Sequence, residues 1–473
     1  MISRTRSNLK AGSSKLASIL MASGLSIFAY SAPATAWSLK EAAAPYEGTS
    51  ITILDETTPL QEAMAKLVPD FTKETGINVK YELLNHFDVI GKGQADMVSG
   101  KGTYDGVMLH SFQMGPMLDA GVVRPIDDFM GNKKLADPNI DLTDLISSPY
   151  KSTSVFKGKN YGFLSWNYNS VYWARNDLLS HPGEKKAFKS KYGYDLAPAK
   201  TMQQMADIAE FFTRKKGDSL AGQKLESDFY GIVMEGIKGG TTFPGVWYNF
   251  LKNWGGGLVD GSGKPAFNTA ENIAALKFWA GLWKYSPPGQ AEYSLIDVPT
   301  VMGNGIAAQT IAWSDFVFGI DVPGKSKFAG KFVYGGIPKN TGYTGKGSSN
   351  GAPSIIVVSE ASKNAEQTFL FMQWMASKKV QEKLFNAIGG GVPLRDSTFE
   401  MGVVKNSSNP TLYTAMRDSL AVTEGKPKMP QFFELYDELG AIVQNIGLGK
   451  ISPEEGVKIG QAKMEKICKN CLL

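Results

Sequence analysis

Aromatic residues beside hydrogen-bonding residues are the part of this sequence best suited to contact a ligand. Trp, Tyr and Phe make up 11% of the 473 residues, and many of them neighbour Asn, Asp, Gly or Ser, as in Trp166-Asn167 and Trp313-Ser314-Asp315. An aromatic face can stack on a flat, weakly polar ligand such as a sugar ring, while carboxylates and amides take hydroxyl groups in pairs. The alternative is a large core in which Trp and Tyr tips are hydrogen-bonded at the edge.

Residues for catalysis or metal binding form no comparable pattern. The chain has only three His residues and contains no H-E-x-x-H motif. A secreted glycosidase would need two opposed carboxylates. Glu56 and Asp315 could take those roles, but no spacing singles them out. We therefore expect a protein that is not an enzyme and that needs no metal or other cofactor.

The two Cys residues, Cys468 and Cys471, form a lone C-x-x-C at the end of the chain. Such a pair can be half of a zinc site or a redox pair, but no second Cys pair and no helix-start context accompany it. In an oxidising compartment a small disulfide is the simpler interpretation. Neither reading makes this pair the functional centre.

The first 36 residues have the order of a secretory signal peptide. Four Arg or Lys residues lie between Arg4 and Lys15, a mostly apolar stretch covers about 16–30, and Ala34-Thr35-Ala36 is a small-x-small cleavage signal. The apolar stretch is too short to span a bilayer permanently. We predict cleavage after Ala36 and a mature chain that starts at Trp37. No Cys stands at the cleavage point, so we expect a periplasmic protein without a lipid anchor.

Length and charge exclude other classes of protein. A mature chain of about 437 of the 473 residues is too long for one core and predicts two or three domains. The formal net charge is +5, but four positive charges belong to the predicted signal peptide. The remainder is near neutral, and its Lys and acidic residues are interspersed. We therefore expect no nucleic-acid partner.

The start of the mature chain alternates between strand and helix patterns. A β-branched strand at 50–54 is followed by the helical pattern "QEAMAKLVPDFTKETG" and by a second strand, "INVKYELL", which together indicate a parallel sheet. Thr57 or Thr58 can cap the helix. Pro69 lies inside the helical pattern, so the sequence does not decide between a continuous helix and a kinked one. A further strand ends at His110. Ligands of open α/β sheets bind at the carboxyl ends of strands, near residues such as Glu56 and His110.

Several longer segments resemble one family, the bacterial extracellular solute-binding proteins, family 1, of sugar ABC transporters, a group that includes maltose-binding proteins. Among them are "GKGTYDGVMLH", "LDAGVVRPIDDFM", "YGFLSWNYNSVYWARNDLL", "AAQTIAWSDF" and "GGGVPLRDS". They occur in the family's order and span nearly all of the mature chain. One departure is "SSNGAPSIIVV", which lacks a Trp that the family often has in this Gly-rich segment.

The resemblance implies an α/β fold of the type II periplasmic binding proteins, with two lobes joined by hinge crossings and one ligand held in the cleft. Crossings placed near Leu164, Gly351 and Thr398 divide the chain into an N-lobe of 48–164 plus 353–397 and a C-lobe of 165–352 plus 398–473.

Strand ends and the resemblance together predict which residues contact the ligand. The candidates are Glu56, Thr57, Thr58, His110, Gln113, Trp166, Asn167, Asn169, Trp247, Tyr248, Trp313, Asp315, Asn350 and Arg395. Several have a purely structural alternative: a helix cap for Thr57 or Thr58, a hinge turn for Trp166, Asn167 and Asn169, core packing for Trp313, helix capping by Ser111 beside His110 and Gln113, and a surface salt bridge for Arg395.

The predicted function follows from this set. We expect a monomer that captures a neutral carbohydrate, which could be a monosaccharide, a sugar alcohol or a short oligosaccharide. Hinge closure would trap the ligand, and the closed form would deliver it to the membrane permease of an ABC importer. A non-sugar solute is the alternative: a polyamine needs several carboxylates, and a phosphorylated polyol or an opine needs convergent Arg or Lys. The candidates hold few of either, which favours a neutral ligand.

Overall fold

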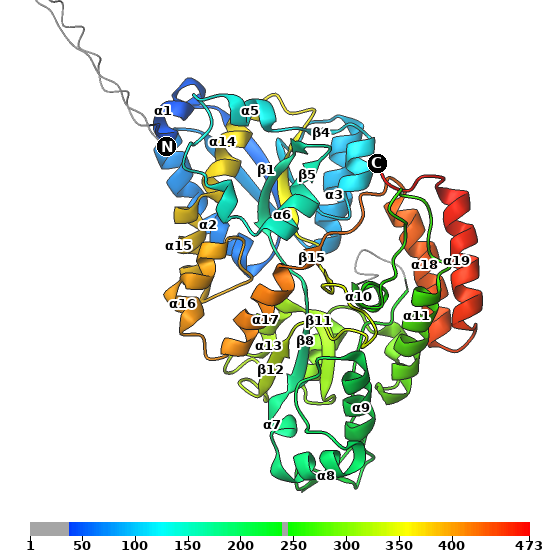
Figure 1. Ribbon diagram of the computed structural model, residues 1–473. Helices are drawn as coiled ribbons and strands as arrows, with labels where there is room; N and C mark the ends of the chain where they lie inside the picture. Colours follow the sequence, from blue (N-terminus) through cyan, green and yellow to red (C-terminus); the bar gives the residue numbers. More distant parts are fainter. Residues whose placement is uncertain (1–36, 239–244) are drawn as a thin grey trace, which may run out of the picture. The chain divides into compact units, whose positions relative to one another are not determined.

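The computed structural model describes residues 37–238 and 245–473, and Trp37–Leu473 form one compact unit (Figure 1). The predicted signal peptide, residues 1–36, lies outside the described residues and stays a prediction. Within the described ranges, no helix combines the length and the apolar character that crossing a membrane requires.

The larger of the two main sheets is built from both halves of the sequence. Its strand order is β2-β1-β3-β14-β4, and β7 also pairs with β14. The strands are β1 (Ser50–Glu56), β2 (Asn78–Leu84), β3 (Gly106–His110), β4 (Val123–Arg124), β7 (Gly162–Trp166) and β14 (Ser354–Ser359). β1 is parallel to β2 and to β3, which confirms the predicted parallel unit, whereas β14 is antiparallel to β3. The carboxyl ends of β2, β1 and β3 therefore meet at one edge.

Helix α2 (Pro59–Thr75) follows β1 as the sequence predicts. The Thr58 side chain caps its first turn, Pro59 occupies the first helical position, and Gly76 ends it with a φ of 71°. The helix continues through Pro69. Helix α3 (His86–Ser99) follows β2 and is capped by Asn85. Both helices begin at the edge where the strands end, which brings their first turns toward the same place.

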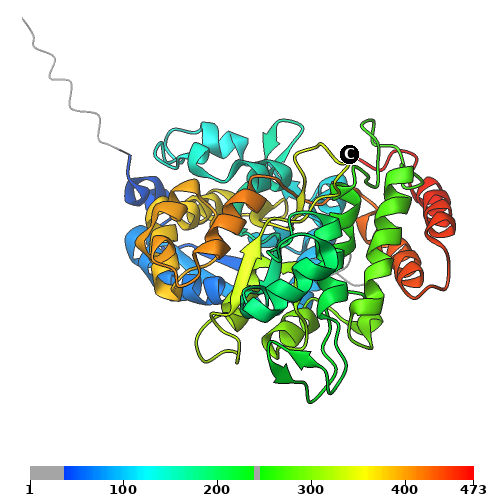
Figure 2. The same cartoon turned by 60° about the horizontal axis from the view of Figure 1, so that its bottom comes forward.

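The smaller main sheet is antiparallel and has the order β11-β8-β12. Its strands are β8 (Ser170–Arg175), β11 (Gln309–Trp313) and β12 (Phe332–Gly335). β8 and β11 are buried along their whole length. Three helices, α11 (Ala270–Leu282), α18 (Phe432–Gly447) and α19 (Pro453–Ile467), pack on one another and lie side by side in both ribbon views (Figures 1 and 2).

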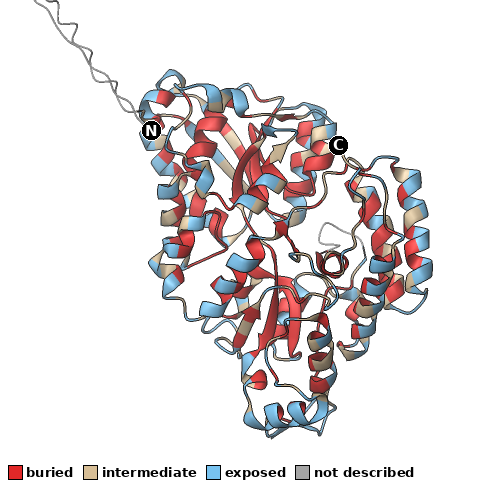
Figure 3. Ribbon diagram, in the orientation of Figure 1, coloured by how far each residue is buried: buried red, intermediate tan, exposed pale blue. Residues whose placement is uncertain are grey.

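The remaining elements cover these sheets and connect them. The helices are α1 (Leu39–Ala43), α4 (Met114–Asp119), α5 (Asp127–Gly131), α6 (Ser147–Ser154), α7 (Asn176–Leu179), α8 (Pro182–Tyr192), α9 (Met202–Phe212), α10 (Gly245–Asn253), α12 (Asp297–Gly303), α13 (Val317–Ile320), α14 (Ala365–Ala376), α15 (Lys378–Ile388), α16 (Gly402–Lys405) and α17 (Pro410–Leu420). The short strands are β5 (Val155–Phe156), β6 (Lys159–Asn160), β9 (Ser219–Leu220), β10 (Gln223–Lys224), β13 (Ser349–Asn350) and β15 (Thr423–Glu424). Figure 3 shows that the strands are buried and that solvent-facing residues gather on the outer faces of the helices.

Two short segments enter or leave the larger sheet close to each other, one leading to the smaller sheet and one coming from the separate β13–β15 pair. Residues 167–169 connect β7 of the larger sheet to β8 of the smaller sheet, and residues 351–353 connect β13 to β14. Asn169 and Gly351 pair with each other in an isolated bridge, so the two connections lie side by side. Two of the crossings expected from the sequence, near Leu164 and Gly351, fall close to these connections. The crossing near Thr398 and the lobe boundaries stay a proposal.

The end of the chain carries the expected disulfide. Cys468 and Cys471 are joined by a disulfide bond and both are buried. The backbone N–H of Cys471 donates to the carbonyl oxygen of Gly263 at 2.9 Å. The prediction of a small terminal disulfide is confirmed, and it holds the chain end against the loop before α11.

Gly162 on β7 is a position where the sheet has no room for a side chain. A Cβ added there would lie 2.1 Å from the carbonyl oxygen of Ile356 on β14. We expect Gly162→Ala to lower the free energy of unfolding by about 1–3 kcal/mol, because the strand pair must shift. Gly91→Ala on the exposed face of α3 is the matched control: its Cβ would meet nothing within 4 Å, and we expect a gain of about 0.5–1 kcal/mol. Urea unfolding compares the two, and equal stability of Gly162→Ala and the wild type would contradict the close packing.

Candidate functional site

A cavity of about 200 Å³ receives side chains from both main sheets. β1, β3 and β7 of the larger sheet contribute to it at their carboxyl ends, and β11 contributes from the smaller sheet. Seven aromatic residues line it: Phe87, Phe112, Trp166, Tyr168, Trp313, Phe316 and Phe432. The polar lining consists of Glu56, Thr58, His86, His110, Asp315 and Lys426. The lining is therefore mostly aromatic, with a few polar groups at strand ends.

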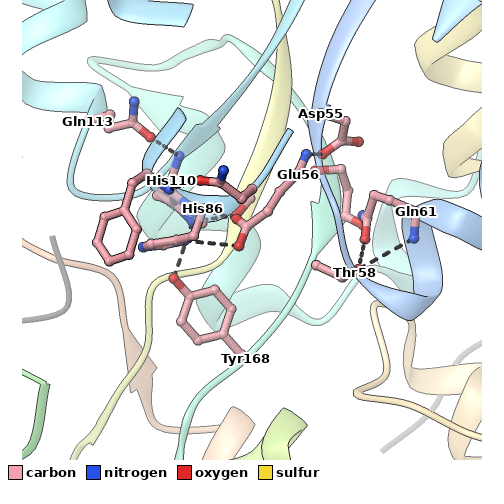
Figure 4. A network of polar contacts seen from close by, with 12 residues as sticks. Asp55, Glu56, Thr58, Gln61, His86, His110, Gln113 and Tyr168 are labelled. Atoms are coloured by element: carbon pink, nitrogen blue, oxygen red, sulfur yellow. Dashed lines mark hydrogen bonds and ion pairs between the residues drawn. The ribbon is translucent and has the colours of Figure 1, made fainter. Parts of the chain in front are cut away.

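Glu56 stands at the centre of the polar side of this cavity (Figure 4). Its Oε1 lies 2.9 Å from His86 Nδ1, and its Oε2 lies 3.0 Å from His110 Nε2. Burial alone would raise the pKa of Glu56, but the hydrogen bonds from His110 and His86 outweigh it and lower the pKa to about 2. The carboxylate is therefore ionised and held between two imidazole rings.

The alternation of side chains along β1 explains why Glu56, and not Asp55, faces the cavity. Asp55 points to the other face of the sheet, where its carboxyl group accepts a hydrogen bond from Tyr81 Oη at 2.6 Å. Asp55 is fully buried there, and burial raises its pKa to about 7. Thr58, two residues beyond Glu56, reaches the cavity from the first turn of α2.

Trp313 is fixed at the opposite side of the cavity by a buried carboxyl group. Its indole Nε1–H donates to Glu235 Oε1 at 2.8 Å, and its ring meets that of Tyr168 edge to face, with 5.3 Å between centroids. Lys426 Nζ lies 5.5 Å from the centroid of the Trp313 ring and donates to Asn350 Oδ1. Burial raises the pKa of Glu235 to about 8 and lowers the pKa of Lys426 to about 7. Two buried titratable side chains, Glu235 and Lys426, thus hold the Trp313 indole in place.

Asp315 offers the cavity an acceptor without a protein partner. It lies in the short 3₁₀ turn Ser314–Phe316 that follows β11. Its Oδ1 is buried and has no hydrogen-bond partner within residues 37–238 and 245–473. Burial, together with the nearby charge of Glu56, raises its pKa to about 7. An unpaired buried acceptor costs about 1–3 kcal/mol, and a ligand hydroxyl could remove that cost.

Six of the residues predicted from sequence line this cavity, and eight do not. The lining set is Glu56, Thr58, His110, Trp166, Trp313 and Asp315. The residues placed elsewhere are Thr57, Gln113, Asn167, Asn169, Trp247, Tyr248, Asn350 and Arg395. The structure therefore brings together the predicted residues that stand at or just beyond strand ends, while most of the others support their surroundings.

The predicted residues near the connections between the sheets make structural contacts. Asn167 Nδ2 donates to the carbonyl oxygen of Pro393 at 2.9 Å, and Asn169 Oδ1 accepts from Ser314 Oγ at 2.9 Å. Asn350 accepts a hydrogen bond from Lys426 and so lies just behind the lining. Their amides fix the two connections, which matches the hinge-turn alternative for this group.

Thr57 and Gln113 serve their own strand ends. The Thr57 backbone N–H donates to the carbonyl oxygen of Leu84 at 2.7 Å and prolongs the pairing of β1 with β2. Gln113 Oε1 accepts from the His110 backbone N–H at 3.0 Å. Neither side chain is aimed at the cavity, although each helps to position a neighbour that is.

The two aromatic candidates on α10 are buried. Trp247 is 1% exposed and lies against Phe267, so it packs in the core. Tyr248 lies behind the cavity lining, with the Lys426 ammonium 5.9 Å from its ring centroid.

Arg395 lies neither in the cavity nor on the surface. It is 1% exposed, and its guanidinium donates to the carbonyl oxygens of Ala376, Ile140 and Asp141 and pairs with Asp144 at 3.3 Å. Its position differs both from a cleft arginine and from a surface salt bridge. A fully bonded arginine of this kind ties the end of α14 to the segment before α6.

The candidate list predicted from the sequence omits several lining residues. His86 follows β2 as Glu56 ends β1, so the same strand-end rule would have found it. Tyr168 stands within the segment that carried Trp166. Lys426 and Phe432 come from the loop and helix start after β15, and no local pattern connects them with β1 or β11. Long-range packing alone brings them to the site.

Two short patterns in the sequence match catalytic motifs but lack the required context. Residues 319–326 match the spacing of a phosphate-binding loop, yet they begin inside the short helix α13 instead of after a strand and are not followed by a helix. Residues 347–351 match the G-x-S-x-G sequence motif of a nucleophile elbow. Ser349 is buried there and its hydroxyl donates to the carbonyl oxygen of Ser170 at 2.7 Å. Neither match places a reactive group in the cavity.

Two α/β lobes with an aromatic cavity where their strands end define a ligand-binding protein of the two-lobed type. Comparison with known proteins makes this specific. The chain belongs to the bacterial extracellular solute-binding protein family, whose model matches residues 55–382.

Its relatives have low sequence identity, but the similarity extends over most of each chain. The chain is 24% identical to a probable amino-acid ABC transporter periplasmic-binding protein of Sinorhizobium fredii, over 89% of each chain. It is 23% identical to an erythritol/L-threitol-binding protein of Mycolicibacterium smegmatis, over 75% of this chain and 72% of the relative.

Solved structures establish the fold. An ABC transporter solute-binding protein from Agrobacterium radiobacter in complex with ribitol has a TM-score of 0.72 and 23% identity, covering 89% of this chain and 99% of that one. Maltose-bound MalE3 of T. maritima has a TM-score of 0.70 and 17% identity, covering 89% and 100%. The fold is the two-lobed α/β fold of type II periplasmic binding proteins, as the sequence predicted.

The buried carboxyl group of Glu235 should make stability depend on pH. Its pKa is about 8 in the folded protein and 4.5 in a model peptide, so its contribution is fully present below about pH 4.5 and is lost as the pH rises toward 8. Each such group contributes a slope of up to about 1.4 kcal/mol per pH unit. We expect Glu235→Gln to lose this slope between pH 5 and pH 7, because glutamine cannot ionise.

Urea unfolding at pH 5, 6 and 7 measures the effect. Glu438→Gln is the control, since Glu438 lies in an exposed ion pair with Lys463, and this variant should keep the slope of the wild type. Identical slopes in Glu235→Gln and the wild type would show that Glu235 is not held protonated by burial.

Proposed function

We propose that this protein is the substrate-binding component of an ABC importer and that it captures a neutral sugar or sugar alcohol in the cavity between its two sheets. The observation that carries this proposal is the lining itself, in which seven aromatic rings face a small number of hydrogen-bonding groups. Aromatic faces stack on the C–H side of a sugar or polyol, and Glu56, Asp315 and Thr58 supply acceptors for hydroxyl groups. Residues for covalent catalysis are not needed, and we propose no enzymatic activity.

The size of the cavity favours a small ligand. Its volume of about 200 Å³ is below the range of about 300–1,000 Å³ that is typical for drug-sized ligands. Solved relatives of the same fold are described in complex with ribitol, D-mannitol and alpha-D-tagatose. A monosaccharide or a linear sugar alcohol therefore fits the proposal better than a long oligosaccharide.

Closure of the two lobes on the ligand is the mechanism that we propose. The ligand would contact the larger sheet through Glu56 and the smaller sheet through Trp313, so only the closed state gains the full binding energy. Phe87 on α3 and Ile296 before α12 both line the cavity, although each side chain is 59% exposed. Closing the lobes would bury these two apolar side chains and add to the stability of the closed state.

The closed form would then dock on the membrane permease of the importer. Family membership and the predicted signal peptide support a periplasmic location for this step. We propose that the protein acts as a monomer with one ligand site.

A solute that carries an amine is the second candidate. Glu56, Asp315 and Glu235 all contribute electrostatically to the environment of Tyr168, and an ammonium group could compensate several carboxylates at once. Against it, Lys426 lies in the same lining, where its ammonium group would repel a cationic solute. A ligand screen that contains polyols and amines separates the two candidates.

Trp313→Ala should weaken binding of the ligand by about tenfold or more, equivalent to about 1.4 kcal/mol, because it removes the stacking face of the smaller sheet. Isothermal titration with ribitol, D-mannitol, erythritol, tagatose, maltose and spermidine identifies the ligand and gives the affinity, and Trp166→Ala should behave similarly. Trp254→Ala is the control: Trp254 is half-buried, packs on Phe278 with 4.9 Å between ring centroids, and lies outside the cavity. Unchanged affinity in both cavity variants would reject this site, and binding of spermidine alone would reject the neutral ligand.

A further inference from the structure

Glu56, His86 and His110 form a cluster that sugar binding alone does not explain. Each offers one ligand atom for a metal ion, and these atoms lie within 4.8 Å of one another. The three residues come from the carboxyl ends of neighbouring strands in the order β2, β1, β3, with the carboxylate on the central strand. Two of the three His residues in the whole sequence are placed here. The sheet thus brings together three groups that are far apart along the chain.

The two distances between the carboxylate and the imidazoles are close to those between ligands of one ion. The Glu56 carboxylate lies 2.9 Å from His86 Nδ1 and 3.0 Å from His110 Nε2. A Zn²⁺ ion holds nitrogen and oxygen ligands at about 2.0–2.2 Å, so two ligands of the same ion are separated by about 3 Å. Each imidazole nitrogen that faces Glu56 can give up its proton and bind the ion in the neutral form of the ring. The three ligand atoms lie within 4.8 Å of one another, so side-chain movements must draw them closer before one ion can contact all three.

The surroundings of His110 favour a fixed ligand. Its second nitrogen, Nδ1, lies 2.7 Å from Ser354 Oγ and 3.2 Å from Tyr168 Oη. Either oxygen can accept a proton on Nδ1, so Nε2, which donates to Glu56 while no ion is bound, can lose its proton and bind the ion. The ring is 1% exposed and stacks on Phe112 with 4.9 Å between centroids. An apolar wall and a partner on the second nitrogen are both common around metal-binding histidines.

His86 supplies the adjustable side of the cluster. Its side chain is 24% exposed, and its Nε2 has no hydrogen-bond partner within residues 37–238 and 245–473. Nδ1 donates to Glu56 while no ion is bound, and Nε2 can carry the proton when Nδ1 binds an ion. His86 begins α3 and lies next to Phe87 at the exposed rim, so an ion can enter from the cavity.

We propose that Glu56, His86 and His110 bind a divalent transition-metal ion of the zinc type at the floor of the cavity. Two imidazoles and one carboxylate are a donor set for Zn²⁺, Co²⁺, Ni²⁺ or Cu²⁺, whereas Ca²⁺ and Mg²⁺ prefer oxygen ligands alone. With three protein ligands, at least one coordination position faces the cavity and is open to water or to a hydroxyl group of a bound solute. The proposal does not depend on the identity of the organic ligand.

Titration of the EDTA-treated mature protein with Zn²⁺ alone tests the proposal. We expect one ion per chain by isothermal titration, and a visible absorption band when Co²⁺ replaces Zn²⁺. His86→Gln and Glu56→Gln should each weaken binding of Zn²⁺ by at least about 30-fold. His181→Gln is the matched control, because His181 caps α8 and lies outside the cavity, and it should bind Zn²⁺ like the wild type. Thermal unfolding of each variant shows whether it is folded.

Two results would overturn the proposal. One is the absence of zinc binding by the folded wild type. The other is binding that survives in both His86→Gln and Glu56→Gln, since this would place the ion elsewhere. Titration of the metal-free protein with ribitol and D-mannitol is a separate measurement. If the folded metal-free protein binds neither these polyols nor the other neutral ligands of the panel, the proposed sugar ligand is rejected without affecting the metal result, and the reverse also holds.

Discussion

A buried carboxylate between two imidazole rings is the interaction on which the ligand site depends. An ionised carboxylate away from water is costly unless hydrogen bonds compensate it. Glu56 obtains that compensation from His86 and His110, which stand at the ends of the strands on either side of β1. The pairing of β2, β1 and β3 must therefore be in register for the charge to be tolerated. The larger sheet must therefore fold correctly for the polar side of the cavity to form.

The opposite wall of the cavity, around Trp313, is held by buried groups whose charge can change near neutral pH. Trp313 is held by Glu235, and Lys426 lies over the indole face and is bonded to Asn350 near the connection between the sheets. Burial moves the pKa values of Glu235 and Lys426 toward one another, to about 8 and about 7. Near neutral pH their charges are therefore easily lost or gained. This wall can adapt to a ligand at little electrostatic cost, whereas the ionised Glu56 on the other wall stays charged.

Local patterns in the sequence predict the first parallel unit well, because its caps and strand ends are determined by near neighbours. Thr58, Pro59 and Gly76 act where the sequence places them. The same reasoning recovers the part of the site that stands at strand ends, and applied to β2 it would have added His86. It fails for Lys426, whose position depends on packing between distant segments. It also fails for Arg395, whose partners lie more than 250 residues earlier in the chain and at the end of α14.

Aromatic content alone is a poor guide to the site. Trp173, Trp247 and Trp279 are among the largest fully buried side chains and stabilise the core. What distinguishes Trp313 and Trp166 is their position, since each is the last residue of a strand that ends at the cavity. An aromatic ring at a strand end cannot complete its packing within its own sheet. Its free face is available to a ligand, and the strand behind it keeps that face in a fixed orientation.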